Sequence, residues 1–515
     1  MLPFNNHPRL NISKMNKVKF LLLTLGVVLF SCTDLEEEPV GLLAPDGFFQ
    51  TTADIQTAAN AAIGHMIHED FWGRKMSLTI MLRGDMVDIG DPTTSTRRIE
   101  HNDFNVPTDN GMIDGYWLRT YQIVAAANQA IIGAQDVEVE DAIKNPVTAQ
   151  AHFSRAFTYF HLVRQFGDIP FIDENTDLTE AATAARTPAA DVYASIISDL
   201  EFAAEWLPAT QAARSIPSKA AAESYLALVH LTLGNWQEAY DNAMSVISNE
   251  SAYGLGLEPD FQDLFDASLI DGSPEPIFTL DHIGATNGDD GRDYQAALTG
   301  IRGNNRYGYG GGWSVAVPSL AVFETWDDRD YRKDVSFDAS GTFDGAVETF
   351  DVFMNFHSRG VNRPHIAKYT RMFGPTATGN GRGSNYNYSM IRYAEVLLIA
   401  AEALNEINPG TAEAEGFVNR VRARAANGTD FPAPVESGMS QGAFRDMVMD
   451  ERRLELAFEF KRWYDIARRQ LGSEVFSADG LEGAKANFDP SQDYLFPLPA
   501  NEIDRNPSLT QNPGY

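Results

Sequence analysis

The chain has 515 residues, and 71 acidic against 40 basic side chains give it a formal net charge of −31 at pH 7. Such a surface repels phosphate backbones, which argues against a nucleic-acid partner. Apolar residues make up 44% and charged residues 22%, as in ordinary globular proteins. Cys32 is the only cysteine, so no internal disulfide can form and the fold must be held by its core.

The N-terminus has the pattern of an export signal. Residues 1–31 carry basic but no acidic side chains, and an apolar run at 20–30 precedes Cys32. This run is too short to span a bilayer, which needs about 20 apolar residues. A start at Met15 would give a more typical signal length. Residues 29–32 resemble a bacterial lipobox, so we expect removal of the signal and acylation of Cys32. The alternative is an ordinary cleavable signal that leaves a free thiol.

The rest of the chain divides by composition. Residues 32–45 are acidic and contain proline, which is typical of a solvated tether. Residues 46–515 are predicted to form a single domain. Helical periodicity dominates 46–253 and 391–515, whereas 254–390 is rich in Gly, Asn, Asp and Tyr and is predicted to be loop-rich. Beyond the signal no long apolar segment occurs, so the mature chain is not expected to span a membrane.

Apolar residues at helical spacing, with capping and breaking residues at the ends, predict a mostly α-helical protein. The expected helices cover residues 51–66, 116–133, 147–166, 188–206, 218–233, 235–249, 391–407, 411–426 and 441–470.

Two pairs of these helices have the pattern of helical hairpins. In 218–249, Ala227 permits a close approach, Gly234 and Asn235 form the turn, and Trp236 faces back onto the first helix. This order matches a tetratricopeptide unit, and residues 392–425 form a looser copy. The predicted fold is therefore a tetratricopeptide-like scaffold with a loop-rich middle region that contains Gly, Tyr and Trp.

The C-terminal third carries a series of specific motifs. Residues 392–398 read RYAEVLL, residues 450–459 read DERRLELAFE, residues 462–466 read RWYDI, and the chain ends with NPSLTQNPGY. In the N-terminal half, FGDIP occurs at 166–170. In their order and spread these motifs resemble the SusD/RagB family of outer-membrane nutrient-binding lipoproteins.

The resemblance implies a SusD-like α-α superhelix and no catalysis. It also implies a lipid-anchored position on the outer membrane, facing the cell surface, as a lid on a SusC-like TonB-dependent transporter. Family members capture oligosaccharides, or in some cases peptides. The acidic residues at 34–38 resemble the surface-export signal of such lipoproteins.

Motifs for metal or phosphate chemistry are weak. The sequence has no phosphate-loop motif and no His-Glu-x-x-His. His65 and His68 are three residues apart on a predicted helix but have no clear third ligand, so we expect no metal there. The acidic loop 287–293 could hold structural calcium, but a solvated turn is the simpler interpretation, and no cofactor is expected.

A sugar site needs aromatic platforms with polar side chains beside them. Tryptophans on helix faces are expected in the core, and so is the one in a family-like stretch; these are Trp117, Trp206, Trp236, Trp326 and Trp463. The remaining two are candidates for ligand contact. Trp313 lies with Tyr307 and Tyr309 in a Gly-rich loop, and Trp72 lies in a short segment before Gly73.

In the starch-binding relative, the aromatic arc comes from an early loop-rich insert and from the middle of the chain. Here the early region has no tryptophan, but it offers Asp88, Asp91, Arg97 and Asn102 as polar candidates.

We therefore expect a surface protein that binds oligosaccharides or polysaccharides and delivers them to a transporter. The alternatives are a peptide-binding member of the same family, a tetratricopeptide adaptor that binds another protein, and a surface glycosidase. The glycosidase would need two carboxylates about 5–10 Å apart. The sequence does not identify the glycan.

Overall fold

The computed structural model describes residues 47–284, 292–305, 311–374 and 383–515. The chain divides into a unit that ends at Phe48 and a large unit of Phe49–Tyr515, to which the following description applies. The predicted signal, Cys32 and the tether lie outside the described residues, and so do Tyr307, Tyr309 and most of the acidic loop 287–293.

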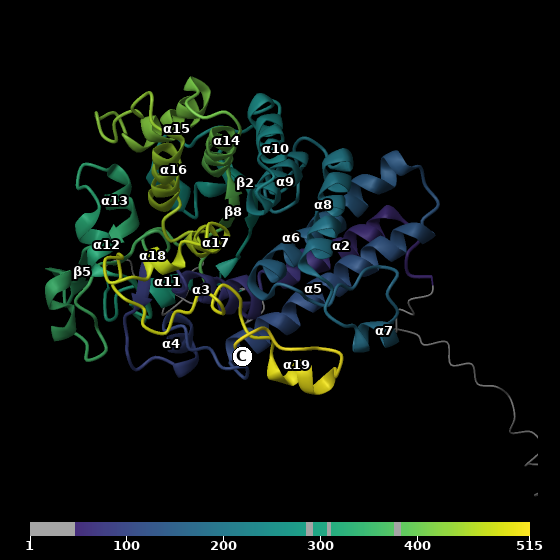
Figure 1. The fold of residues 1–515 in the computed structure, drawn as a ribbon, viewed down its shortest axis with the longest axis horizontal. Coiled ribbons are helices and arrows are strands. Elements are labelled where there is room, and N and C mark those ends of the chain that lie inside the picture. Colours follow the sequence, from purple (N-terminus) through teal and green to yellow (C-terminus); the bar gives the residue numbers. More distant parts are fainter. Residues whose placement is uncertain (1–46, 285–291, 306–310, 375–382) are drawn as a thin grey trace, which may run out of the picture. The chain divides into compact units, whose positions relative to one another are not determined.

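The helices predicted in the N-terminal half are present and pack against one another (Figure 1). They are α2 (Thr52–Met66), α5 (Gly111–Asp136), α6 (Asp141–Phe166) and α8 (Ala189–Trp206). A capping box between Thr51 and Asp54 starts α2. Helix α6 begins six residues before the predicted position and includes Pro146. It ends at Gly167, whose φ of 68° a glycine adopts without strain.

Both predicted hairpins are also present. The first is α9 (Lys219–Leu233) with α10 (Trp236–Ser248), and Gly234 makes the left-handed turn between them. The second is α14 (Tyr393–Ile407) with α15 (Ala412–Ala425). Helix α10 packs against α14, so the two hairpins stack although they are far apart in sequence (Figure 1). The mostly helical, tetratricopeptide-like fold class is confirmed.

The helix predicted over 441–470 is wrong as a single element. The structure has α16 (Gln441–Glu455) and α17 (Arg462–Arg468), with a turn between them. Phe458 and Phe460 in this turn have φ values of 65° and 63°, which a helix cannot contain. The turn carries Phe460 into the aromatic core and Glu459 into an ionic network, and these contacts outweigh the cost of the left-handed backbone.

The middle region consists of short elements, as predicted. Four antiparallel two-stranded ribbons form: β1 (Val87–Ile89) with β3 (Ala316–Pro318), β2 (Pro276–Leu280) with β8 (Tyr388–Arg392), β4 (Phe337–Asp338) with β7 (His365–Ile366), and β5 (Ser340–Phe343) with β6 (Ala346–Thr349). The shorter helices are α3 (Lys75–Leu82), α4 (Thr96–Asn102), α7 (Leu178–Thr183), α11 (Gln295–Thr299), α12 (Leu320–Thr325), α13 (Tyr331–Ser336), α18 (Gly472–Val475) and α19 (Ala500–Arg505), with a π-helical turn at Glu69–Gly73 and 3-10 turns at Phe261–Phe265, Ile270–Gly272 and Phe350–Asn355.

A buried ionic network joins this middle region to the C-terminal helices. Glu451 and Glu455 of α16 and Glu459 of the following turn are part of it, and their partners come mainly from distant segments. Five cations and five anions are linked by ion pairs: Arg332, Lys368, Arg392, Arg422 and Arg424 with Glu275, Asp330, Glu451, Glu455 and Glu459. The charges balance, so the network can be buried without an unpaired ion.

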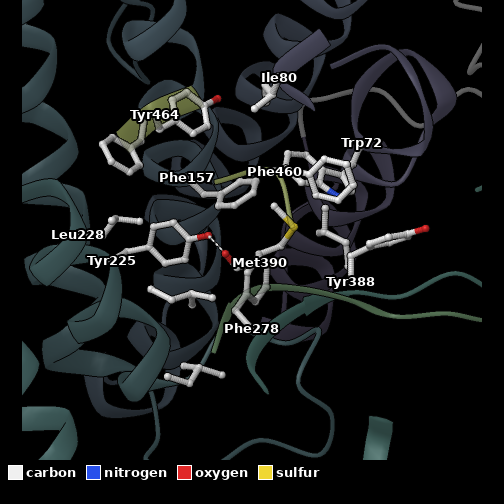
Figure 2. Close-up of a cluster of buried hydrophobic side chains, with 14 of the residues drawn as sticks. Trp72, Ile80, Phe157, Tyr225, Leu228, Phe278, Tyr388, Met390, Phe460 and Tyr464 are labelled. Carbon is white, nitrogen blue, oxygen red and sulfur yellow. Dashed lines mark hydrogen bonds between the residues drawn. The ribbon is translucent and has the colours of Figure 1, made fainter. Parts of the chain in front are cut away.

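An aromatic cluster forms the core beside this network. Figure 2 shows Trp72, Phe157 and Phe460 approaching one another from three separate segments. The Trp72 and Phe460 ring centroids lie 5.1 Å apart at an interplanar angle of 74°, and Tyr225 donates a hydrogen bond to the Met390 carbonyl. Within the part of the chain that the structure describes, no helix is both long and apolar enough to cross a bilayer.

Candidate ligand-binding site

Two segments predicted to carry the ligand site are paired in the structure. Strand β1 follows α3 in the early insert, and β3 lies in the middle of the chain, with Asp88 opposite Val317. The pairing continues past the strand ends, because the Asp91 amide donates to the Ser314 carbonyl over 2.7 Å. Asp88 and Asp91 of the early region therefore lie beside the segment that contains Trp313.

The backbone around Trp313 is held by α11. The Trp313 amide donates to the Ala297 carbonyl over 2.6 Å, and the Gly312 amide donates to Ile301 over 2.8 Å. A Cβ atom at Gly312 would lie 2.1 Å from the Gly300 carbonyl oxygen, so this close contact requires glycine. The glycine run before Trp313 thus serves, at its end, to seat the tryptophan on α11.

The Trp313 side chain is half-buried and adjoins a second aromatic ring. Its ring centroid lies 6.1 Å from that of Tyr294, with the planes tilted by 53°. The Arg74 guanidinium stacks on Tyr294, 4.7 Å from its centroid. Tyr294 is buried and packs against the Trp313 ring, so Trp313 provides the aromatic surface of the kind that contacts the C–H face of a sugar.

Asp91 organises the polar side of the site. It is fully buried, and its carboxylate accepts from Arg302 over 3.0 Å and also pairs with Arg359. Burial alone would raise the pKa of Asp91, but the hydrogen bonds from Thr93 and Arg359 lower it below the usual value. Arg302 also donates to the Trp313 carbonyl over 2.5 Å, so it ties the acid and the tryptophan segment together.

Asp88 and Asn102 form a second polar group, and Asp88 lies three residues before Asp91 in the chain. Asn102 is buried and donates to Asp88 over 2.7 Å, and Arg363 donates to the other Asp88 oxygen over 3.1 Å. Burial raises the pKa of Asp88, but Lys485 and Arg363 lower it below its usual value overall. Asp88 keeps about a third of its side chain exposed, whereas Asn102 acts through Asp88.

Arg97 and Arg98 lie on α4 next to this group, and both are half-buried. The Arg97 carbonyl accepts a hydrogen bond from Asn110, which fixes the start of α4 against α5. The Arg98 guanidinium donates to the Thr94 hydroxyl over 2.9 Å.

Trp72 does not join this group. Its side chain is 2% exposed and packs against His161 and Phe460 in the core (Figure 2). The spaces that it lines have volumes of about 10 Å³, too small for a sugar ring. The residues around it looked like a loop, but they form a π-helical turn that directs the tryptophan inwards. We therefore leave Trp72 out of the candidate site.

The histidine pair considered for metal is bridged by an arginine. Arg119 places its two terminal nitrogens 2.9 Å from His65 and 3.0 Å from His68. A guanidinium in this position occupies the space that a cation would need. Among the residues described, no cluster of three or more His, Cys, Asp and Glu has a metal-binding arrangement.

One pattern typical of hydrolases occurs at 438–442, which reads GMSQG. Its serine, Ser440, is the N-cap of α16 and accepts a hydrogen bond from the Ala443 amide. A nucleophile elbow instead places its serine on a sharp turn between a strand and a helix. Here residues 433–439 are loop, so this motif is a helix cap.

Two open grooves lie elsewhere on the molecule. One, of about 590 Å³, is lined by Trp117, Tyr121 and Ile132 of α5 together with C-terminal residues such as Leu509. The other, of about 460 Å³, lies between Trp326 and the loop around Pro432. Their tryptophans are 3% exposed, so neither groove presents a tryptophan ring as Trp313 does.

Several residues of the site were not identified from the sequence. Tyr294, Arg302 and Arg359 lie in irregular segments where no spacing singles out a side chain. The sequence indicated only their region, because all three fall in the Gly- and Asp-rich middle region that was predicted to face the ligand.

Comparison with known proteins identifies close relatives. A model described as the SusD family matches residues 357–515, and one described as "Starch-binding associating with outer membrane" matches residues 48–231. SusD-like protein P2 of Formosa agariphila is 51% identical over 97% of this chain and 100% of its own length.

Solved structures share the fold. A SusD homolog from Bacteroides thetaiotaomicron superposes with a TM-score of 0.79 at 20% identity, over 92% of this chain and 98% of that one. A laminarin-binding SusD-like protein gives a TM-score of 0.75 at 24% identity, over 91% of this chain and 100% of that one.

Proposed function

Because this chain belongs to the SusD family of binding proteins, we propose that it captures oligosaccharides at the cell surface and passes them to a SusC-like TonB-dependent transporter. The observation that carries the proposal is the half-buried Trp313 beside Tyr294, with Arg302 joining the Trp313 backbone to Asp91 of the early insert. Aromatic faces take up the apolar side of a sugar, and the polar groups take its hydroxyls.

One solved structure and one family model support a glycan rather than a peptide. One solved structure with this fold is a laminarin-binding protein, and the family model over residues 48–231 is described as starch-binding. A peptide site would rely on backbone partners and less on an aromatic platform. Electrophoresis through gels that contain neutral, uronate or sulfated polysaccharides tests this, because a bound polymer retards the protein.

The matched variants are Trp313→Ala and Trp206→Ala. Both tryptophans are half-buried, but Trp206 lies on the helical scaffold. We expect Trp313→Ala to weaken binding of the retarding polymer about tenfold or more, since aromatic anchors dominate binding energy. Trp206→Ala should leave binding unchanged. Equal affinity in both variants, or retention of free peptides but of no glycan, would contradict the proposal.

The proposed location is the outer leaflet of the outer membrane, with Cys32 acylated and residues 32–45 as the tether. The family model that matches residues 48–231 is described as associating with the outer membrane, which supports this position. The transporter partner can be tested by affinity capture of this protein from detergent-solubilised membranes. A large β-barrel protein should be recovered in stoichiometric amounts, and its absence would leave the protein as a binding lipoprotein without that partner.

A further inference from the structure

The candidate site has the opposite charge from the rest of the chain. The protein carries a net charge of −31. Around Trp313 and Tyr294, however, four guanidinium groups adjoin two carboxylates. The cations are Arg74, Arg98, Arg302 and Arg359, and the anions are Glu69 and Asp91. In a protein with so large a net negative charge, such a local excess of positive charge calls for a physical reason.

Arg74 pairs with Glu69, but the carboxylates do not fully satisfy the other three arginines. Arg302 and Arg359 share the single carboxylate of Asp91, which is fully buried beneath them. The Nε of Arg302 is buried and has no hydrogen-bond acceptor among the residues that the structure describes. Asp91 thus positions two guanidiniums without neutralising both, and it does not itself face a ligand.

The positive charge of Arg98 is balanced even less by nearby carboxylates. Its guanidinium donates to the Thr94 hydroxyl, and within the described ranges it has no carboxylate at ion-pair distance. Its pKa is lowered to about 10, first by burial and then by the nearby charges of Arg74 and Arg97. These like charges repel one another, and an anion bound beside Arg98 would offset that repulsion.

The chemistry of the group indicates the class of anion. A guanidinium presents a planar fork of N–H donors that matches carboxylate and sulfate oxygens in pairs. A site for a neutral sugar needs both donors and acceptors, since each hydroxyl does both. Here the Asp91 carboxylate is buried and already accepts from Thr93 and two arginines, so it is not available to a sugar hydroxyl.

From this arrangement we infer that the glycan is anionic and carries sulfate or carboxylate groups. One of these groups is bound by Arg98, Arg302 and Arg359 while a sugar ring lies on Trp313. The inference rests on the proposed function and specifies its substrate class. Arg359 keeps 43% of its side chain exposed and can reach a ligand without rearrangement of the core.

The test uses affinity gels with three series of polymers. These are neutral glucans (laminarin and starch), polyuronates (alginate and polygalacturonate) and sulfated galactans (carrageenans). The variants are Arg98→Gln and Arg359→Gln. The control is Arg329→Gln, which removes the same charge from an exposed arginine that pairs with Asp327 away from the site. Melting temperatures of all variants establish that they fold.

We expect retardation by one anionic series, weakened about tenfold in Arg98→Gln and in Arg359→Gln, which corresponds to about 1.4 kcal/mol. Arg329→Gln should match the wild type. Retardation by uronates alone or by sulfated polymers alone identifies the anionic group. Raising NaCl from about 0.05 to about 0.5 M should weaken wild-type binding more than binding by Arg359→Gln.

Two other outcomes overturn the inference in different ways. Retardation by neutral glucans alone, lost in Trp313→Ala but kept in both arginine variants, would refute the anionic ligand and leave the proposed function intact. Retardation by no polymer, together with binding of free peptides, would refute both.

Discussion

Replacing Glu455 with glutamine tests whether the buried ionic network stabilises the fold. Glu455 is fully buried at the end of α16. Its carboxylate accepts from Arg392 over 2.6 Å and from Arg332 over 3.1 Å, and it also pairs with Arg424. Burial alone would raise its pKa, but Arg424, Arg392 and Arg332 together hold the pKa well below the usual range. The carboxylate is therefore ionised and central to the charge balance.

The magnitude follows from that balance. Glu455→Gln keeps the side-chain shape but leaves five cations against four anions in a region that is buried except at Arg422. Breaking a buried ion pair in this way costs about 3–5 kcal/mol. For the unit of Phe49–Tyr515, a per-residue unfolding entropy of about 2.1 cal/mol/K gives about 1 kcal/mol/K. The melting temperature should therefore fall by about 3–5 °C.

The assay is thermal unfolding followed by circular dichroism, with urea unfolding as a second measure. The control is Glu205→Gln on the exposed face of α8, where the same chemical change should alter stability by less than about 0.5 kcal/mol. If the two variants melt at the same temperature, the network does not contribute the stability assigned to it, and the reasoning from charge balance is refuted.

Three further predictions follow from the same structure. Because the folded-state pKa of Glu455 is depressed, its contribution to the free energy of unfolding is complete above about pH 5 and is lost as the pH falls towards that pKa. The wild-type urea midpoint should therefore drop between pH 6 and pH 3. An equally steep drop in Glu455→Gln would contradict this. Gly312→Ala should lower ligand affinity at least tenfold in affinity gels because its Cβ would meet the Gly300 carbonyl. The control, Gly416→Ala on α15, has open space around its Cβ, so it should raise stability by about 0.5–1 kcal/mol and leave affinity unchanged. Equal ligand affinities of the two variants would refute the role of Gly312. Cys32→Ala should release a folded, ligand-competent protein into the soluble fraction, and continued sedimentation with membranes in cells lacking the transporter would rule out the anchor.

The helical scaffold was predictable because its signals are local. Apolar spacing, Gly167 and Gly234 placed the helices and their ends within a few residues, except where α5 and α6 extend further at their N-termini. The break between α16 and α17 was not predictable, because Phe458 and Phe460 carry no sign that their backbone is left-handed. Only their tertiary contacts make that conformation favourable.

The candidate site could be predicted by region and only in part by residue, since Trp313 and Asp91 were expected whereas Tyr294, Arg302 and Arg359 were not. The expectation that the early insert and the middle of the chain form one surface agrees with the pairing of β1 and β3. Which side chains face a ligand depends on contacts between distant segments, such as Arg359 with Asp91. Trp72 could not be placed for the same reason. A tryptophan before a glycine suggests a loop, and its burial against the distant Phe460 cannot be deduced from neighbouring residues.

The pairing of β1 with β3 also has a consequence for how the protein matures. Asp91 and Arg302, which hold the two sides of the site together, are 211 residues apart in the chain. Closing so large a loop costs entropy that is regained only when the intervening scaffold has formed. The site therefore assembles late in folding, and ligand binding becomes a sensitive report on whether an exported chain has reached its native state.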